Sequence, residues 1–156
     1  MNIDDLKSLM DEFDPAALLP EIDTIVGKAE LVMRIAIMVG PIILMVMGLM
    51  YLFASPKEAN YYFGYRCYFG MGSVDAWRFS QRLAGIVWGG LGLILTIVMV
   101  LICSSFRGME VMDMVGSAVK CVIWQVVLVA AACLAINAVV AMRFNRRGER
   151  RLKKEE

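Results

Sequence analysis

Hydrophobic positions fill three long stretches of this 156-residue chain, and charged residues lie between and outside them. The stretches cover residues 35–54, 83–103 and 121–142, and none of them contains Asp, Glu, Lys or Arg. A helix rises about 1.5 Å per residue, so about 20 residues cross the roughly 30 Å hydrocarbon core of a bilayer. Because backbone groups in lipid must be satisfied within the segment, each stretch predicts a transmembrane helix. We therefore expect an all-α fold, an integral membrane three-helix bundle.

The chain before the first apolar stretch is acidic and amphipathic. In residues 2–14 the apolar positions have helical spacing, which predicts a short amphipathic helix; these positions are Ile3, Leu6, Leu9, Met10 and Phe13. Asp14-Pro15 is expected to end this helix, and a second amphipathic piece of about residues 16–30 leads into the membrane. We favour a solvated helix pair near the surface over a partner-docking helix. The chain then divides into an acidic segment 1–34, a membrane domain 35–142 and a basic tail 143–156.

Positive charge is distributed unevenly among the segments that flank the apolar stretches. The last 14 residues contain seven Lys or Arg, residues 55–82 contain four, residues 104–120 contain two and residues 1–34 contain three. Cytoplasmic segments of membrane proteins carry an excess of Lys and Arg. With three spans, this bias predicts a multi-pass protein of the cell membrane with its N-terminus outside and its C-terminus in the cytoplasm.

Small and polar residues inside the predicted spans indicate how the helices pack. Gly40-Pro41 predicts a local kink in the first span, and Gln125 with Asn137 in the third can form interhelical hydrogen bonds. Gly85 and Gly89 form a small-xxx-small pair that permits close helix approach, within one chain or in a homo-oligomer. No ionisable residue lies inside a span, which favours a packed bundle over an ion or proton path.

The composition excludes several kinds of chemistry. The chain has no histidine, and its four cysteines (Cys67, Cys103, Cys121 and Cys133) form no CxxC motif. Ser-His and Cys-His nucleophile pairs and imidazole zinc sites are therefore absent. We expect no catalytic residues, no metal and no cofactor, and we interpret the protein as one that is not an enzyme. Whether Cys103 and Cys121, both near the outer surface, pair in a disulfide stays open.

The segment 60–85, between the first two apolar stretches, carries most of the distinctive residues outside the two ends of the chain. Gly64 permits a turn, Ser73 is a good N-cap, and a helix is expected to begin near Val74 and continue into the second span. On that helix Trp77, Gln81 and Gly85 share one face, and Arg78 and Arg82 share a neighbouring face. An aromatic belt with snorkelling arginines explains Tyr61, Tyr62, Phe63, Tyr68 and Phe69. It does not explain the fixed order Asn-x₃-Gly-Tyr-Arg followed by Trp-x₃-Gln-x₃-Gly.

That order resembles the SdpI family of small bacterial membrane proteins, whose pattern is approximately Pro-Asn-x₃-Gly-Tyr-Arg-Thr, a Ser or Thr, and then Trp-x₂-Ala-Asn-x₃-Gly. The matching residues are Asn60, Gly64, Tyr65, Arg66, Ser73, Trp77 and Gly85. Ala59 replaces the Pro, Cys67 the Thr, and Ser80-Gln81 the Ala-Asn, although Gln81 keeps an amide. The resemblance implies three helices with the motif between the first two. It also implies the role of the larger members, which is immunity to a secreted toxic peptide combined with sequestering a transcriptional repressor at the membrane.

Three functions are then in competition. The first is a non-enzymatic immunity or signalling protein. Its cytoplasmic surface of Arg66, Trp77 and Gln81 would bind a partner such as a regulatory protein, or hold the bundle in one state, and a peptide toxin would be met in the membrane or on the outer side. Arg66 is then expected to point into a pocket closed by Trp77 and Gln81, with Arg78 on the neighbouring face of the helix. The alternative is binding of a lipid headgroup or small molecule by Arg66, Arg78 and Arg82, as in a transporter subunit or lipid-acting enzyme. The third is a scaffold whose tail only anchors to anionic lipid. Nucleic-acid binding is not expected, because topology explains the basic tail.

Overall fold

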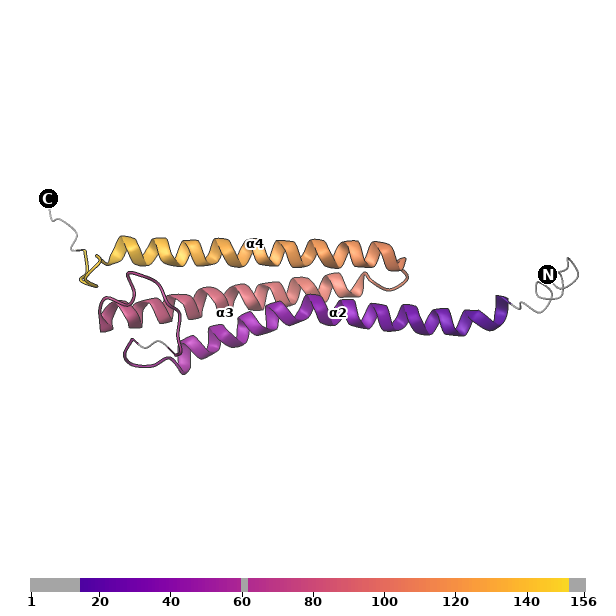
Figure 1. Cartoon of the computed structure of the whole chain (residues 1–156), viewed down its shortest axis with the longest axis horizontal. Helices are drawn as coiled ribbons and strands as arrows, with labels where there is room; N and C mark the ends of the chain where they lie inside the picture. Colours follow the sequence, from indigo (N-terminus) through magenta and orange to yellow (C-terminus); the bar gives the residue numbers. More distant parts are fainter. Residues whose placement is uncertain (1–14, 60–61, 152–156) are drawn as a thin grey trace, which may run out of the picture.

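The computed structural model describes residues 15–59 and 62–151 and contains three long helices (Figure 1). These are α2 (Pro15–Phe53), α3 (Val74–Ser104) and α4 (Val111–Arg143), and all three are long and apolar enough to cross a membrane. Within the described residues, the only β pairing is an isolated bridge between Phe144 and Arg150. The predicted all-α membrane bundle is therefore confirmed. The amphipathic helix expected over residues 2–14 lies outside the described residues.

The helices extend beyond the uncharged stretches that predicted them. α2 runs without a break from Pro15 to Phe53, so the amphipathic piece at residues 16–30 and the first span form one helix. α4 begins at Val111, ten residues before the uncharged stretch 121–142, so residues 111–120 are helical and do not belong to a loop between the second and third spans. The reason is physical: an uncharged run marks the part of a helix that lies in lipid, whereas a helix can continue into water with charged residues such as Asp113 and Lys120 on it.

The apolar surface of the bundle faces outward as well as inward. Large hydrophobic side chains along α3 and α4 are exposed, including Ile94 (61%), Leu101 (64%), Val126 (64%) and Leu134 (71%). A soluble monomer rarely exposes contiguous apolar surface on this scale, whereas lipid solvates it. The bundle is thus built to contact a lipid bilayer.

Glycines let α2 and α3 approach closely. A Cβ at Gly48 of α2 would lie 2.2 Å from the backbone nitrogen of Gly89, and one at Gly85 would lie 2.6 Å from Cγ of Leu52. Gly92 is similarly close to the backbone of Met45. The small-residue face predicted at Gly85 and Gly89 therefore packs within one chain, against a glycine of α2 that the sequence analysis did not single out.

A polar residue of α4 supplies the hydrogen bond that a proline removes from α2. Pro41 has no N–H, so the carbonyl of Ile37, four residues earlier, lacks its helical donor. The amide of Gln125 supplies one, with Nε2 2.9 Å from the Ile37 oxygen. A Cβ at Gly40 would lie 2.6 Å from Oε1 of Gln125, so glycine leaves room for that amide. The axis of α2 changes direction along its length (Figure 1), as the Gly40-Pro41 pair predicted.

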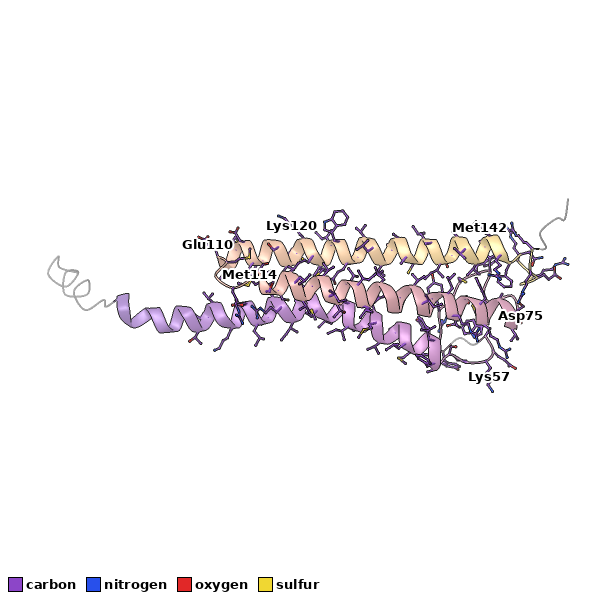
Figure 2. The ribbon with its side chains drawn as sticks, turned by 180° about the vertical axis from the view of Figure 1, so that it is seen from behind. Lys57, Asp75, Glu110, Met114, Lys120 and Met142 are labelled. Carbon is purple, nitrogen blue, oxygen red and sulfur yellow. The ribbon has the colours of Figure 1, made fainter. Side chains whose placement is uncertain are left out.

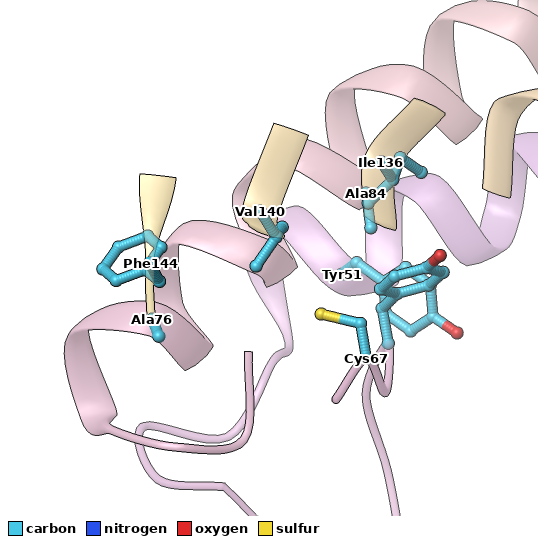
Figure 3. Close-up of a cluster of buried hydrophobic side chains, with 8 residues drawn as sticks. Tyr51, Cys67, Ala76, Ala84, Ile136, Val140 and Phe144 are labelled. Atoms are coloured by element: carbon cyan, nitrogen blue, oxygen red, sulfur yellow. The ribbon is translucent and has the colours of Figure 1, made fainter. Parts of the chain in front are cut away.

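The connection between α2 and α3 and the segment after α4 lie at the same end of the bundle. Figure 2 shows Lys57, Asp75 and Met142 at this end, and Glu110 with Met114 at the other. A buried cluster at this end joins all three helices and the α2–α3 loop; it contains Tyr51, Tyr65, Cys67, Ala76, Ala84, Ile136, Val140 and Phe144 (Figure 3). The candidate site lies on this cluster.

Candidate functional site

The start of α3 is fixed by a side-chain cap. Ser73 has an extended backbone, and its Oγ accepts from the backbone N–H of Ala76 at 3.1 Å, as the sequence predicted. Asp75 in the first turn has the charge that the helix dipole favours. With this start, the face of α3 that carries Trp77, Gln81 and Gly85 turns inward, and all three residues are buried.

Gly64 and Trp77 form the first contact between the loop and α3. Gly64 has φ +120°, a conformation that residues with a Cβ rarely adopt, and a Cβ there would lie 2.6 Å from the Trp77 ring. The Trp77 side chain is fully buried, and its Nε1 donates to the carbonyl of Pro56 at 2.9 Å. Glycine is required at 64 both for its backbone and for the indole beneath it.

Gln81 binds the loop backbone in the way that a neighbouring strand would. Its Oε1 accepts from the N–H of Tyr65 at 2.8 Å, and its Nε2 donates to the carbonyl of the same residue at 2.8 Å. The side chain is 1% exposed. Both polar groups of one loop residue are thereby satisfied away from water, where an unpaired group is costly. The amide therefore fixes the path of the loop over α3.

The Tyr65 side chain continues this connection to the third helix. Its ring packs edge-on against Tyr51 of α2 and Trp88 of α3, with centroid distances of 6.4 and 5.7 Å. Its hydroxyl lies 3.2 Å from the carbonyl oxygen of Cys133 and 3.1 Å from Oδ1 of Asn137, both on α4. Burial raises the pKa of this hydroxyl, which stays protonated and can donate. One loop residue thus joins three helices.

Arg66 does not join Trp77 and Gln81. Along the loop, Tyr65 and Cys67 are buried, whereas Arg66 and Tyr68 are exposed, so side chains alternate inward and outward. Trp77 and Gln81 are buried and converge on Gly64 and Tyr65, whereas the Arg66 side chain is exposed. The expected three-residue pocket is not formed. The matching Asn60 lies outside the described residues.

The aromatic residues of the loop divide into two groups. Tyr62 is 96% exposed and Tyr68 is 71% exposed, as a belt at a membrane surface would require. Phe63 and Phe69 are partly buried and pack against the cluster of Figure 3. The belt interpretation therefore fits the two tyrosines and not the two phenylalanines, while Tyr61 lies outside the described residues.

Cys67 lies in a small buried contact with α3. A Cβ at Gly70 would lie 2.6 Å from Sγ of Cys67 and 2.8 Å from Oγ of Ser80, so the thiol and the hydroxyl both pack against Gly70. Burial raises the pKa of the Cys67 thiol above its ordinary value, and hydrogen bonds from Gly70 and Ser80 oppose the shift. The thiol is therefore protonated and inert. All four cysteines are free, so Cys103 and Cys121 do not pair in this structure.

The segment after α4 folds onto the loop, which the sequence analysis did not predict. Phe144 is 1% exposed and packs on Phe79 at 5.6 Å between centroids; Figure 3 shows it beside Ala76. Asn145 closes a turn, since its side-chain oxygen accepts from the N–H groups of Arg147 and Glu149. The signals were present, as Asn and Gly are typical turn residues, but the surrounding arginines suggested only a charged tail.

This C-terminal turn, residues 144–150, contacts the N-terminus of α3 directly. The Ser73 hydroxyl donates to the carbonyl of Gly148 at 2.7 Å, and Gly148 has φ +73°. A Cβ at Gly148 would lie 2.5 Å from the backbone of Gly72 and Ser73, and a Cβ at Gly72 would lie 2.7 Å from the Gly148 nitrogen. Ser73 thus has two roles, as the cap of α3 and as the anchor of the C-terminal turn.

Beside this contact is a cavity of about 460 Å³ with a basic lining. Its cations come from the loop (Lys57), from α3 (Arg78 and Arg82) and from the C-terminal turn (Arg150). Within the described residues, no cluster of three or more Cys, Asp or Glu side chains is arranged to hold a metal ion. The arrangement is suited to binding an anion.

The fold and this site define the class of protein as an integral membrane three-helix bundle with a folded loop between its first two spans. Residues 57–142, more than half of the chain, match the model of the SdpI/YfhL protein family, and the chain belongs to that family. No curated protein and no solved structure gave a match. The match covers the loop, α3 and most of α4, and it leaves the C-terminal turn outside.

Proposed function

We propose that this protein is a non-enzymatic immunity or signalling protein of the SdpI type. Its α2–α3 loop would bind a cytoplasmic regulatory protein, and a secreted peptide toxin would be met in the membrane or on the outer side. The main support is the pair of hydrogen bonds between Gln81 and the backbone of Tyr65, because it makes the loop a fixed surface instead of a slack connector. Membership of the family supports the choice of role.

The proposed contact surface is the outward side of this loop. Tyr62, Arg66 and Tyr68 are exposed, and buried Tyr65 and Cys67 between them fix the path of the loop. Aromatic residues and arginine are the residue types most enriched at protein interfaces, and a preordered surface loses less entropy on binding. Buried Trp77 and Gln81 then act as supports of the surface, not as contacts.

A survival assay tests this role. A bacterium sensitive to a secreted toxic peptide would express the wild type, Arg66→Ala, Trp77→Ala or the matched control Arg107→Ala, which is exposed in the connection between α3 and α4. We expect the wild type and the control to protect the cells. Arg66→Ala should lose protection although the amount of protein in the membrane is unchanged. Trp77→Ala should lose protection because the loop loses its support. Equal survival of every strain, the empty vector included, would contradict protection.

We further propose that the loop and the C-terminal turn are cytoplasmic and that the N-terminus is outside. The two basic segments lie at the same end of the bundle, as the excess of Lys and Arg requires. Cys67 is buried and cannot report the side, so the probe is Tyr68→Cys compared with Arg107→Cys, in a chain lacking Cys103, Cys121 and Cys133. A membrane-impermeant maleimide should label only Arg107→Cys in intact cells, and the reverse pattern would contradict the orientation.

A further inference from the structure

The basic cavity beside the C-terminal turn has an unbalanced charge. Its lining includes four cations, Lys57, Arg78, Arg82 and Arg150, against a single acid, Asp75, so four positive charges minus one leave a formal charge of +3. Within the described residues, Lys57, Arg78 and Arg82 take part in no ion pair. Cations gathered around one cavity repel one another, and an anion bound between them would relieve that repulsion.

The one ion pair at the cavity does not neutralise it. Nη2 of Arg150 lies 3.9 Å from Oδ2 of Asp75, which is too long for a hydrogen bond. Both side chains are mostly exposed, at 64% and 68%, and an exposed pair at this distance contributes little. Arg150 is therefore available to a ligand in the cavity.

The cavity lies at the depth where phospholipid phosphates lie. Residues 83–104 of α3 carry no charge and, at about 1.5 Å per residue, cover about 33 Å, close to the thickness of the hydrocarbon core. Arg82 immediately precedes this run. Lys57, in the loop after α2, immediately follows the uncharged residues 35–56. The chain thus changes from apolar to basic at the cavity, both after α2 and within α3.

The lining combines the basic side chains with apolar ones. Leu52 of α2 and Phe79 of α3 line the cavity together with the four cations. Arg78 and Arg82 are four residues apart and project from the same side of α3, where two guanidinium groups can donate to one phosphate. An amphiphile with an anionic head fits this combination better than a free ion does, because a free ion gains nothing from the apolar lining.

The geometry points to a specific site for the phosphate of an anionic phospholipid, formed by Lys57, Arg78, Arg82 and Arg150. Three of these residues lie within the region that matches the family, and Arg150 comes from the C-terminal turn outside it. The contact between Ser73 and Gly148 holds this turn against α3 and so keeps Arg150 at the cavity. The tail therefore does more than attract the membrane by its charge; one of its arginines completes a binding site.

Native mass spectrometry of the full chain in detergent micelles tests the site. The protein would be titrated with phosphatidylglycerol, with phosphatidylcholine and, separately, with inorganic phosphate. Both lipids carry a phosphate, but the quaternary ammonium of phosphatidylcholine would be repelled by the four cations of the lining, whereas the glycerol headgroup is neutral. We therefore expect phosphatidylglycerol to bind at least about tenfold more tightly than phosphatidylcholine. Arg78→Gln with Arg82→Gln should remove that preference, and Arg150→Gln should reduce it several-fold.

The matched control is Arg147→Gln, which removes the same charge from the same turn at a residue that does not line the cavity. It should bind phosphatidylglycerol like the wild type. Equal losses with Arg147→Gln and Arg150→Gln would overturn the site in favour of attraction by overall charge. Binding of inorganic phosphate without any preference for phosphatidylglycerol would show that the site takes free phosphate and not a lipid. All substituted side chains are exposed, so the fold should be retained, and circular dichroism checks this.

Discussion

At the scale of single residues, the family pattern around Gly64, Tyr65 and Gln81 is explained by packing. Gly64 makes room for the Trp77 ring, Tyr65 presents its backbone to Gln81, and Arg66 is the one residue of the Gly-Tyr-Arg sequence that faces outward. Most of the motif therefore builds a support, and its arginine is the part that the proposed partner surface uses.

Replacing Gln81 should detach the loop. Gln81→Leu keeps a similar volume but leaves the N–H and C=O of Tyr65 buried and unpaired, at about 1–3 kcal/mol each. We expect a clearly lower midpoint of thermal unfolding in detergent, followed by circular dichroism. Gln81→Asn keeps an amide that is one methylene shorter, so its loss should be smaller. A midpoint for Gln81→Leu equal to that of the wild type would show that these bonds do not stabilise the loop.

Two departures from the family pattern, Cys67 and Ser80, meet at Gly70 and should be coupled. Cys67→Thr adds a methyl group beside the Ser80 hydroxyl, and Ser80→Ala removes a polar neighbour of the thiol. The double variant restores the Thr and Ala of the pattern with room for both. We expect it to be more stable than the sum of the single effects predicts, by about 0.5–3 kcal/mol, the usual range for residues in contact. Additive effects in a double-mutant cycle of chemical unfolding would refute the coupling.

At the scale of elements, close glycine contact determines how α2 and α3 pack. A Cβ at Gly48 would lie 2.2 Å from the nitrogen of Gly89, and backbone cannot move aside as a flexible side chain can. Gly48→Ala should therefore force the two helices apart and cost about 1–3 kcal/mol or more. The matched control is Gly90→Ala, because a Cβ there meets nothing within 4 Å. Unfolding in a denaturing detergent should separate the two variants, and equal stability would rule out the close approach.

The elements themselves were predictable because each has a local cause. Uncharged runs predicted the three spans, and Ser73 predicted the start of α3 to the residue. Contacts between residues far apart in the sequence were not predictable. A sequence pattern indicates which groups must be hydrogen-bonded or packed, but it does not indicate which residue they contact. Gly40-Pro41 predicted a kink and Gln125 an interhelical hydrogen bond, yet nothing in the sequence paired the two. The C-terminal turn was missed for a related reason, since the requirement for glycine at position 148 comes from its close contact with Gly72.

At the scale of the whole molecule, the α2–α3 loop and the C-terminal turn form one folded unit at the basic end of the bundle. The cluster of Figure 3 includes Phe144 together with loop residues Tyr65 and Cys67. The proposed partner surface and the proposed lipid site share this unit but use different side chains, Arg66 on one and Arg78, Arg82 and Arg150 on the other. Occupancy of the lipid site can therefore be changed without altering the partner surface.

Docking of the turn should be visible as resistance to trypsin, which cleaves after arginines such as Arg146 and Arg147. Gly148→Ala meets two costs: φ +73° is unfavourable for alanine, and its Cβ would lie 2.5 Å from the carbonyl carbon of Gly72. Gly108→Ala is the matched control, since φ is +78° there and a Cβ meets nothing within 4 Å. It carries the same backbone cost without the clash.

We expect Gly148→Ala to release the C-terminal peptide about tenfold faster than the wild type, because cleavage follows the population of the undocked turn and about 1.4 kcal/mol changes that population tenfold. Gly108→Ala should leave the rate of this release unchanged. Limited trypsin digestion in detergent, with the released mass measured over time, gives both rates. Equal rates for the two variants would mean that the turn does not dock on Gly72 and Ser73, and Arg150 would then lose its place at the cavity.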